Sequence, residues 1–368
     1  MTYLDHNATS PMTDAAKAAV LEALELPGNA TSQHAHGRTA SRVVNDARQS
    51  LGLAFGVCAQ DIYFTGSGSE ADNQAILSAV RAGTRHLLVS SMDHPASIEA
   101  ALHSGAEVEF IPASIDGLTD MDWLSARLDS WDAADGRPFV SMVAANSECG
   151  VIQPFDRAYE LTRKHDGLLL VDAVQTPGKV EIPILADYIS WSAHKLGGPQ
   201  GVGALFADPS APLDPLIRGG GQEKRKRAGT LNVAGIAGFG AAAKTAVPMT
   251  SHLRDDFEAR LAALDPAIFF LGQSAPRLPN TSLFGVPGTA SQTLMMGLDL
   301  EGISVSTGTA CSSGVVGLSR AVKAMGFADT LEKGVIRVSF GHSNTPADVD
   351  AFLSAWAKIR KLNTKVAA

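Results

Sequence analysis

Two charged side chains follow strand-like runs at positions where open α/β sheets bind ligands. Residues 168–171 are apolar and lead to Asp172, and the mainly apolar residues 188–191 lead through Ser192 to Lys195. Such runs are typical of strands that are buried on both faces of a parallel sheet. Ligands of these sheets bind in the crevice outside the carboxyl ends of the strands. An acid and a primary amine are therefore expected in one binding site.

This pair of side chains suits pyridoxal phosphate. The amine of Lys195 can form a Schiff base with the cofactor aldehyde, and Asp172 can keep the pyridine nitrogen protonated so that the ring accepts electrons. Gly197 and Gly198 follow the lysine and would let a ring approach the backbone. The ordinary alternative is a surface lysine, but the buried run before Lys195 argues against it.

A turn rich in glycine and serine, residues 65–71, follows a short strand-like segment and opens a helix. Glycines allow a ligand to approach the backbone, and free N–H groups at a helix start favour an anion such as phosphate. Many turns of this composition only cap a helix. The turn therefore indicates a phosphate site only in combination with Asp172 and Lys195.

Two further polar segments follow strand-like runs. His94 could stack on a ring and transfer protons near neutral pH, although a histidine here could equally be a capping or surface residue. Ser147, in the segment 146–150, could donate a hydrogen bond to a phenolic oxygen or a substrate carboxylate. Its neighbour Cys149 is expected to be a small buried side chain rather than a nucleophile.

The C-terminal part of the chain carries a cysteine and an arginine of interest. Cys311 lies among small polar residues, from 306 to 314, which suits an accessible nucleophile better than a structural cysteine. Its thiolate could attack a sulfur atom held at the cofactor. Arg337 lies within a strand-like run, where its guanidinium could bind a substrate carboxylate. A buried ion pair is an equal alternative for this arginine.

A basic run, residues 224–227, lies between a glycine triplet at 219–221 and the pair Gly229-Thr230. Four consecutive cations usually form a solvated loop. The glycines on both sides indicate a loop shaped for an anion, and the two interpretations are compatible.

The bulk composition excludes several classes of protein. The net charge of −8 over 368 residues gives no general attraction to nucleic acid or to an anionic membrane surface. No apolar run approaches the roughly 20 residues of a membrane span, and the N-terminus does not resemble a secretory signal. Three scattered cysteines are too few for a disulfide framework or a zinc site. A cytoplasmic protein is expected.

Strand-like and helical stretches alternate between about residues 60 and 245, which predicts an α/β fold with a mostly parallel sheet. The expected strands of this sheet are residues 62–64, 86–90, 108–111, 139–144, 168–171, 188–191 and 202–206. Helices are expected at 42–54 and 233–245. After Pro248 we expect a smaller α+β domain with strands near 280–284 and 335–340 and a closing helix from Pro346.

In this order, the motifs resemble those of the cysteine desulfurases of the NifS/IscS type, which are class V, fold type I pyridoxal-phosphate enzymes. The matching segments are 4–9, 28–29, 37–38, 64–70, 172–175, 192–195, 219–223 and 227–230, together with His94, Cys311 and Arg337. The resemblance implies an aspartate-aminotransferase-like large domain at 16–248, a small domain at 249–368 that carries the cysteine loop, and an N-terminal segment, 1–15, that packs on the small domain.

The resemblance also implies roles for these residues. Lys195 would bond the cofactor, Asp172 would contact the pyridine nitrogen, and His94 would stack on the ring as an acid or base. The other implied cofactor contacts are Gly68, Ser69, Ser192 and His194 for the phosphate, Gln175 for the phenolic oxygen, Ser147, and Thr230 from the second subunit of a homodimer. The implied substrate contacts are Arg337, Asn29 and Ser147. Cys311 would carry the sulfur as a persulfide.

Three departures from the family pattern concern the substrate and the partner. Ser147 stands where the family usually has asparagine, which alters the expected contact with substrate and cofactor. Ser69 replaces a threonine and keeps the hydroxyl group. The chain also ends soon after the helix expected at 348–362, without the tail that many IscS proteins use to dock a scaffold. A dedicated protein acceptor of sulfur, whose identity is left open, is therefore expected.

The expected activity is the conversion of L-cysteine to L-alanine, with the sulfur passed from Cys311 to an acceptor for iron–sulfur cluster assembly, thiolation or cofactor sulfuration. The alternatives are another class V enzyme (a selenocysteine lyase, a C–S lyase or an aminotransferase) and a non-catalytic scaffold for sulfur relay. The thiol argues against an aminotransferase, and the nearly complete set of catalytic residues argues against a scaffold. No metal site is expected, apart from transient ligation of an iron–sulfur cluster by Cys311.

Overall fold

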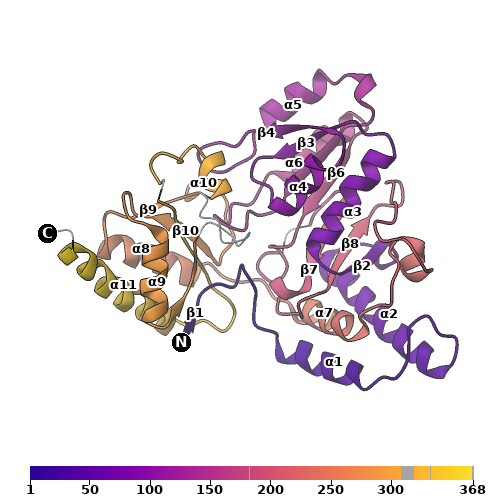
Figure 1. The fold of residues 1–368 in the computed structure, drawn as a ribbon, viewed down its shortest axis with the longest axis horizontal. Coiled ribbons are helices and arrows are strands. Elements are labelled where there is room, and N and C mark those ends of the chain that lie inside the picture. The colour runs from indigo at the N-terminus through magenta and orange to yellow at the C-terminus, as the bar shows by residue number, and fades with distance from the viewer. Residues whose placement is uncertain (182, 308–318, 332, 367–368) are drawn as a thin grey trace.

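The computed structural model describes residues 1–181, 183–307, 319–331 and 333–366. Two units that each contain a sheet lie side by side in Figure 1, and the larger one is on the right. Its strands are β2 (Ile62–Thr65), β3 (His86–Ser90), β4 (Glu107–Ile111), β5 (Phe139–Val143), β6 (Leu168–Asp172), β7 (Tyr188–Ser192) and β8 (Gly203–Ala207). They form one seven-stranded sheet in the order β2-β8-β7-β6-β5-β3-β4.

The sheet is mostly parallel, as the sequence predicts. Strands β4, β3, β5, β6 and β7 run parallel to one another, and only β8 is antiparallel to its neighbours β7 and β2. Every residue of β3, β5, β6 and β7 is buried. Alternate residues along these strands belong to two core clusters, because the sheet is covered on both faces.

Seven helices surround this sheet: α1 (Asp14–Leu24), α2 (Ala35–Phe55), α3 (Gly68–Arg81), α4 (Pro95–Leu102), α5 (Met121–Asp129), α6 (Phe155–Lys164) and α7 (Val233–Thr245). The helix predicted at 233–245 has those bounds. The helix predicted at 42–54 begins earlier, because the ring of His34 caps it by accepting a bond from Gly37 N at 3.3 Å. It ends before Gly56, which adopts a left-handed φ of 70°.

The smaller unit contains a four-stranded antiparallel sheet in the order β12-β13-β10-β9. Its strands are β9 (Phe269–Phe270), β10 (Thr281–Gly285), β12 (Ser306–Thr307) and β13 (Ile336–Ser339), and its helices are α8 (His252–Leu264), α9 (Ser291–Leu300), α10 (Arg320–Ala324) and α11 (Pro346–Val366). The strands expected near 280–284 and 335–340 and the helix from Pro346 are confirmed. In the described ranges, no helix combines the length and the apolar character needed to cross a membrane.

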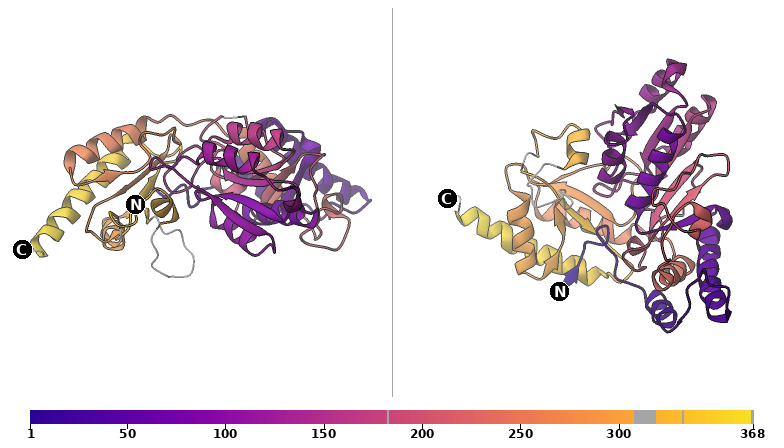
Figure 2. Two further views of the ribbon diagram at one scale, coloured as in Figure 1. Left: turned by 90° about the horizontal axis from the view of Figure 1, so that it is seen from above. Right: turned by 45° about the vertical axis from the view of Figure 1, so that its right-hand side comes forward.

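The N-terminal segment joins the two units. Strand β1 (Thr2–Tyr3) pairs in parallel with β11 (Ile303–Ser304) of the smaller unit, and the chain then crosses to α1 on the larger unit (Figures 1 and 2). Short 3₁₀ turns complete the fold: η1 (Ala59–Asp61), η2 (Ala133–Asp135), η3 (Ala193–Lys195) and η4 (Gln222–Arg225). The domain boundaries expected near residues 15 and 248 stay predictions.

Candidate active site

The predicted acid, amine and imidazole meet at one edge of the seven-stranded sheet. Asp172 is the last residue of β6, and Lys195 closes the turn η3 that follows β7. His94 caps α4, which follows β3. Because β3, β6 and β7 are parallel, their carboxyl ends lie at the same edge. Burial lowers the pKa of His94, and the three groups are close enough for Asp172 to oppose this shift and for Lys195 to add to it.

Lys195 is held as a partly desolvated amine. Its Nζ donates hydrogen bonds to the backbone carbonyls of Asn7 at 2.6 Å and Ala8 at 2.8 Å. Burial, reinforced by the charge of Arg337, lowers the pKa of Lys195 to about 8, while the carboxylate of Asp172 acts in the opposite direction. A substantial fraction of this amine is therefore neutral near physiological pH, as a nucleophilic amine requires.

Asp172 is 5% exposed, and its Oδ1 accepts a bond from Val174 N at 2.9 Å. Burial raises the pKa of this carboxyl, and the neighbouring His94 lowers it. The ring of His94 is open to solvent, and its Nδ1 accepts a bond from Ala96 N at 3.1 Å. The capping role that the sequence left open is thus confirmed for this histidine. Since Nδ1 is an acceptor, the neutral ring carries its proton on Nε2.

The glycine-rich turn brings the start of α3 against the ends of β6 and β7. Ser67 caps the helix by accepting a bond from Glu70 N at 3.1 Å, and α3 begins at Gly68. A Cβ atom on Gly68 would lie 2.7 Å from Cγ2 of Val174 and 3.6 Å from Cβ of Ser192. Only glycine permits this approach, which places the unpaired N–H groups of a helix start beside the site.

An acidic side chain in the same turn is neutralised within the chain. Glu70 accepts a bond from Gly66 N at 2.7 Å and forms an ion pair with Arg227 Nε at 2.8 Å. This acidic residue of the first turn of α3 therefore does not repel an anion at the helix N-terminus. Ser69, the predicted phosphate ligand, is exposed at the first turn of α3.

Gln175 and His194 flank the amine. Gln175 is 3% exposed, and its Nε2 donates to the carbonyl of Asn7 at 3.1 Å. His194 Nδ1 is 3.1 Å from Thr9 Oγ1. Burial lowers the pKa of His194 to about 4, so this histidine is a neutral hydrogen-bonding group at pH 7.

These groups fit the chemistry of pyridoxal phosphate. Lys195 offers an amine for the aldehyde, Asp172 offers a buried carboxylate for the pyridine nitrogen, and the close approach at Gly68 leaves a helix start for the phosphate. Ser192, also buried, ends β7 between the amine and the helix start.

Arg337 is 3% exposed in β13, at the side of the site formed by the smaller unit. Its Nη2 forms an ion pair with Asp5 Oδ1 at 2.7 Å, and its Nη1 donates to the backbone carbonyl of Ser147 at 3.0 Å. Its Nε is buried and has no partner among the described residues. The ion pair that the sequence left as an alternative is present, and the guanidinium still has an N–H group for a ligand, so the substrate role stays a prediction.

For three of the predicted site residues, the described part of the structure gives no contact with Lys195, Asp172 or His94. Asn29 lies between α1 and α2, where its Oδ1 accepts a bond from Thr31 N at 3.0 Å. Thr230 is exposed, and its role in a second subunit stays a prediction. Cys311 lies outside the described residues. The described residue Ser306, in β12, pairs in register with Arg337.

Side chains of the basic run, residues 224–227, form hydrogen bonds or ion pairs within the chain. Lys226 Nζ donates to the carbonyl of Leu213 at 2.7 Å, and Arg227 is paired with Glu70. The interpretation as a simple solvated loop is therefore wrong for these two side chains. Residues 223–225 adopt left-handed φ values of 43°, 54° and 65°. A buried ion pair between Glu223 and Arg48, at 2.6 Å, holds this strained turn.

Sequence reasoning did not assign Asn7, Asp5 or Lys179 to the site. The segment 4–9 contributed to the family resemblance, but no local pattern shows that the carbonyl of Asn7 accepts bonds from two site residues. Lys179 follows no apolar run, and Asp5 lies 332 positions from Arg337 in the chain. Contacts of this kind have no short-range signal in a sequence.

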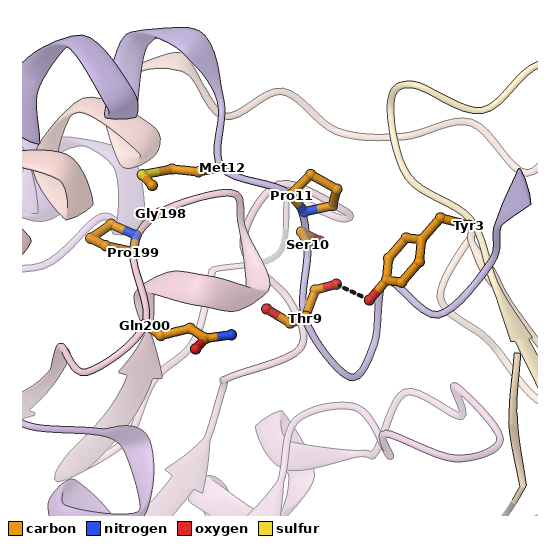
Figure 3. Close-up of a pocket in the computed structure, with 8 residues that line it drawn as sticks. All are labelled: Tyr3, Thr9, Ser10, Pro11, Met12, Gly198, Pro199 and Gln200. Atoms are coloured by element: carbon orange, nitrogen blue, oxygen red, sulfur yellow. Dashed lines mark hydrogen bonds between the residues drawn. The ribbon is translucent and has the colours of Figure 1, made fainter. Parts of the chain in front are cut away.

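A cavity of about 480 Å³ lies beside the site (Figure 3). It is lined by Tyr3, Thr9, Ser10, Pro11, Met12, Gly198, Pro199 and Gln200. Ser10 connects it to the site, because its Oγ donates to the carbonyl of Lys195 at 3.2 Å. Lys195, Asp172 and His94 are not among the residues that line it, so this cavity is adjacent to the site of chemistry rather than part of it.

Comparison with known proteins agrees with this geometry. The family model described as aminotransferase class-V matches residues 2–352. A cysteine desulfurase of Cereibacter sphaeroides is 38% identical over 366 residues, which cover 95% of this chain and 93% of that protein. The cysteine desulfurase IscS of Dictyoglomus turgidum is 33% identical over 98% of this chain and 95% of that protein.

A solved structure shows the same fold. The NifS-like protein from Rickettsia africae superposes with a TM-score of 0.88 at 30% identity, over 98% of this chain and 99% of that chain. The fold class and the family resemblance predicted from the sequence are thus confirmed. The chain belongs to the aminotransferase class-V family and, within it, to the cysteine desulfurases of the NifS/IscS type.

Proposed function

We propose that this protein is a pyridoxal-phosphate-dependent cysteine desulfurase, which converts L-cysteine to L-alanine and transfers the sulfur through Cys311 to a protein acceptor. The observation that carries the proposal is the convergence of Lys195, Asp172 and His94 at one sheet edge, opposite the buried guanidinium of Arg337. When bound, the cofactor supplies an aldehyde that bonds amines and a ring that accepts the electrons released at the substrate Cα.

Lys195 has two tasks in this proposal. Its Nζ, with a pKa of about 8, would hold the cofactor through its aldehyde group. When it is not bonded to the cofactor, the same amine could hold the proton that leaves the substrate Cα. The carbonyls of Asn7 and Ala8, which accept bonds from Nζ, keep the amine at the site in that state.

Asp172 and His94, both in the larger unit, would contact the pyridine ring of the cofactor. The carboxylate of Asp172 would hold the pyridine nitrogen of the cofactor, and a cationic partner there would lower the pKa of this acid, which burial raises. The neutral ring of His94 carries its proton on Nε2, because Nδ1 is engaged with Ala96 N. Nε2 can therefore donate a hydrogen bond into the site, while burial lowers the pKa of His94 and favours the neutral ring.

Arg337 binds the substrate carboxylate in this proposal. Its buried Nε, which lacks a partner among the described residues, can donate to a carboxylate oxygen. Asp5 already accepts a bond from Nη2, so the substrate carboxylate shares the guanidinium with this side chain or displaces it. Ser147, in place of the usual asparagine, contributes its backbone carbonyl to Arg337.

The sulfur transfer step forms one bond and breaks one bond. The thiolate of Cys311 attacks the substrate sulfur, so that an S–S bond forms while the Cβ–S bond breaks. The electron pair of the broken bond stays on Cβ, which takes up a proton to become the methyl group of alanine. The persulfide on Cys311 then passes its outer sulfur to a thiolate of the acceptor protein.

The proposal is tested by the products that the cofactor-loaded protein forms from L-cysteine in the presence of a thiol reductant. Alanine and sulfide in equal amounts are expected. Pyruvate with ammonia would indicate a C–S lyase, amino transfer to an added keto acid would indicate an aminotransferase, and turnover confined to L-selenocysteine would indicate a selenocysteine lyase. A protein that binds the cofactor but forms no product from any of these substrates would support a scaffold instead.

The rate of cofactor loading is expected to rise as the pH passes through about 8. The pKa of Lys195 in the folded chain is lowered from 10.5 to about 8, so the neutral, reactive fraction grows from about a tenth at pH 7 to about a half at pH 8. Stopped-flow absorbance of apoprotein mixed with pyridoxal phosphate measures the rate, and butylamine in place of protein corrects for titration of the cofactor itself. A corrected rate that does not change between pH 7 and 9 would contradict the lowered pKa.

Arg337→Ala is expected to raise KM for L-cysteine by about 10- to 100-fold, with a smaller effect on kcat, because a charge-assisted bond to the carboxylate is lost. Cofactor content should stay near that of the wild type. Arg260→Ala, which removes an exposed arginine of α8, is the control. An unchanged KM in the Arg337 variant would exclude the assigned role.

A further inference from the structure

Lys179 is a buried lysine to which the family resemblance assigns no role. It lies between β6 and β7, 3% exposed, and its carbonyl accepts a bond from Met249 N at 2.9 Å. Burial, with the charges of Lys195 and Arg337, lowers the pKa of its amine well below the ordinary value. Among the described residues, no carboxylate forms an ion pair with it.

The amine of Lys179 is directed at the side chain of Gln175. Its Nζ donates to Gln175 Oε1 at 2.6 Å, and Gln175 Nε2 donates to the carbonyl of Asn7 at 3.1 Å. The same carbonyl accepts a bond from Lys195 Nζ at 2.6 Å. A chain of three hydrogen bonds therefore links the buried amine of Lys179 to the amine that bonds the cofactor.

The two partners of Gln175 determine which way its amide faces. The carbonyl of Asn7 can only accept, so it requires the NH2 end of the amide, and the amine of Lys179 requires the oxygen end. A flipped amide would set two carbonyl oxygens against each other and leave a buried donor of Lys179 unpaired, which is costly. Because the NH2 group has two hydrogens, the one not given to Asn7 remains for a ligand.

We propose that Lys179 is a positioning residue, which holds the amide of Gln175 with its NH2 group toward the Lys195 site so that it donates to the phenolic oxygen of the bound cofactor. This inference rests on the proposed function for the identity of the cofactor, but it does not depend on the substrate or on Cys311. Without Lys179 only the carbonyl of Asn7 orients the amide of Gln175, so the flipped form, with its oxygen toward the negatively charged phenolic oxygen, becomes more populated.

A different role for Lys179 would be a purely electrostatic one, exerted on the site as a whole. The cationic and titratable groups near it are Lys195, Arg337, His6, His194 and, through His6, His342. A charge effect of Lys179 would act whether or not Gln175 is present, whereas a positioning effect requires Gln175. This difference separates the two roles experimentally.

The test is a double-mutant cycle on Lys179→Met and Gln175→Leu, read from the visible absorbance of the bound cofactor as a function of pH. A donor to the phenolic oxygen favours its ionised form, so each single variant is expected to raise the spectral midpoint by about 0.5 or more, a change of about threefold in proton affinity. The double variant is expected to match Gln175→Leu alone. The dissociation constant for pyridoxal phosphate should rise in the same non-additive way.

Two results would overturn the proposal. One is an unchanged midpoint in Lys179→Met, and the other is a shift in the double variant equal to the sum of the single shifts. Thermal unfolding of the apoproteins identifies any variant that does not fold, in which case Lys179→Leu takes the place of Lys179→Met. Lys244→Met, at an exposed position near the end of α7, is the matched control. If no variant releases alanine but the cycle is non-additive, the desulfurase activity fails and the role of Lys179 stands.

Discussion

Lys195→Ala is expected to lower kcat/KM for alanine formation roughly 10³-fold or more, because the variant loses both the amine that bonds the cofactor and the base at the substrate Cα. The pKa of about 8 for this lysine, together with its bonds to two backbone carbonyls, distinguishes it from the surface lysines of the chain. Alanine release from L-cysteine measures the effect. A second measurement is borohydride reduction of the loaded protein followed by peptide mass spectrometry, which should locate the cofactor on Lys195.

The matched control for this variant is Lys17→Ala. Lys17 is exposed on α1, where it pairs with Asp14 at 3.1 Å, and its loss should leave turnover and the labelled peptide unchanged. Cofactor trapped on another lysine, or a Lys195 variant that retains more than a tenth of wild-type turnover, would show that the amine has been wrongly assigned.

Cys311→Ser is expected to reduce alanine formation from L-cysteine to below about 1% of wild type, since a hydroxyl group cannot accept the sulfur as a thiolate does. Cofactor binding and its absorbance should be retained, because Lys195 and Asp172 are unaffected. Mass spectrometry of the wild type after one turnover should show an additional sulfur atom on the peptide that contains Cys311.

The chain offers two other cysteines for comparison. Cys58 is exposed, so Cys58→Ser removes an accessible thiol and should leave turnover unchanged. Cys149 is fully buried, and burial raises the pKa of its thiol to about 12, so it has almost no thiolate at neutral pH. Full activity in Cys311→Ser, or an additional sulfur on Cys58, would contradict the proposed route of sulfur transfer.

The strands of the large sheet could be predicted closely because helices cover both of its faces. Each central strand then has to be apolar along its length, as residues 168–171 are, and such a run is visible without knowledge of its neighbours. The helix α1, which was not predicted, is rich in alanine and packs against α7. Its sequence contains little periodicity, because alanines lie on both its buried and its exposed face.

In the candidate site, too, local features could be predicted from the sequence and contacts between distant segments could not. Asp172, Lys195 and His94 could be predicted because each follows a strand, and the ends of parallel strands meet at one edge of the sheet. The ion pair between Asp5 and Arg337 could not, because the two residues lie 332 positions apart and meet only when the N-terminal segment lies beside β13, where Asp5 bridges to Ser339. For Arg337 the structure shows the ion pair with Asp5 and leaves Nε without a partner among the described residues, so the contact with a substrate carboxylate stays a prediction.

The sequence by itself determined the chemical types at the site and the strand ends that present them, since both depend on local residue order. The tertiary structure alone decided how these groups are oriented and charged. The amide of Gln175 is directed by Lys179, four positions away, and by Asn7, 168 positions away. The lowered pKa of Lys195 likewise comes from burial and from Arg337, in a different unit. Hydrogen-bond direction and desolvation depend on which atoms surround a group in space, and these atoms come from distant parts of the chain.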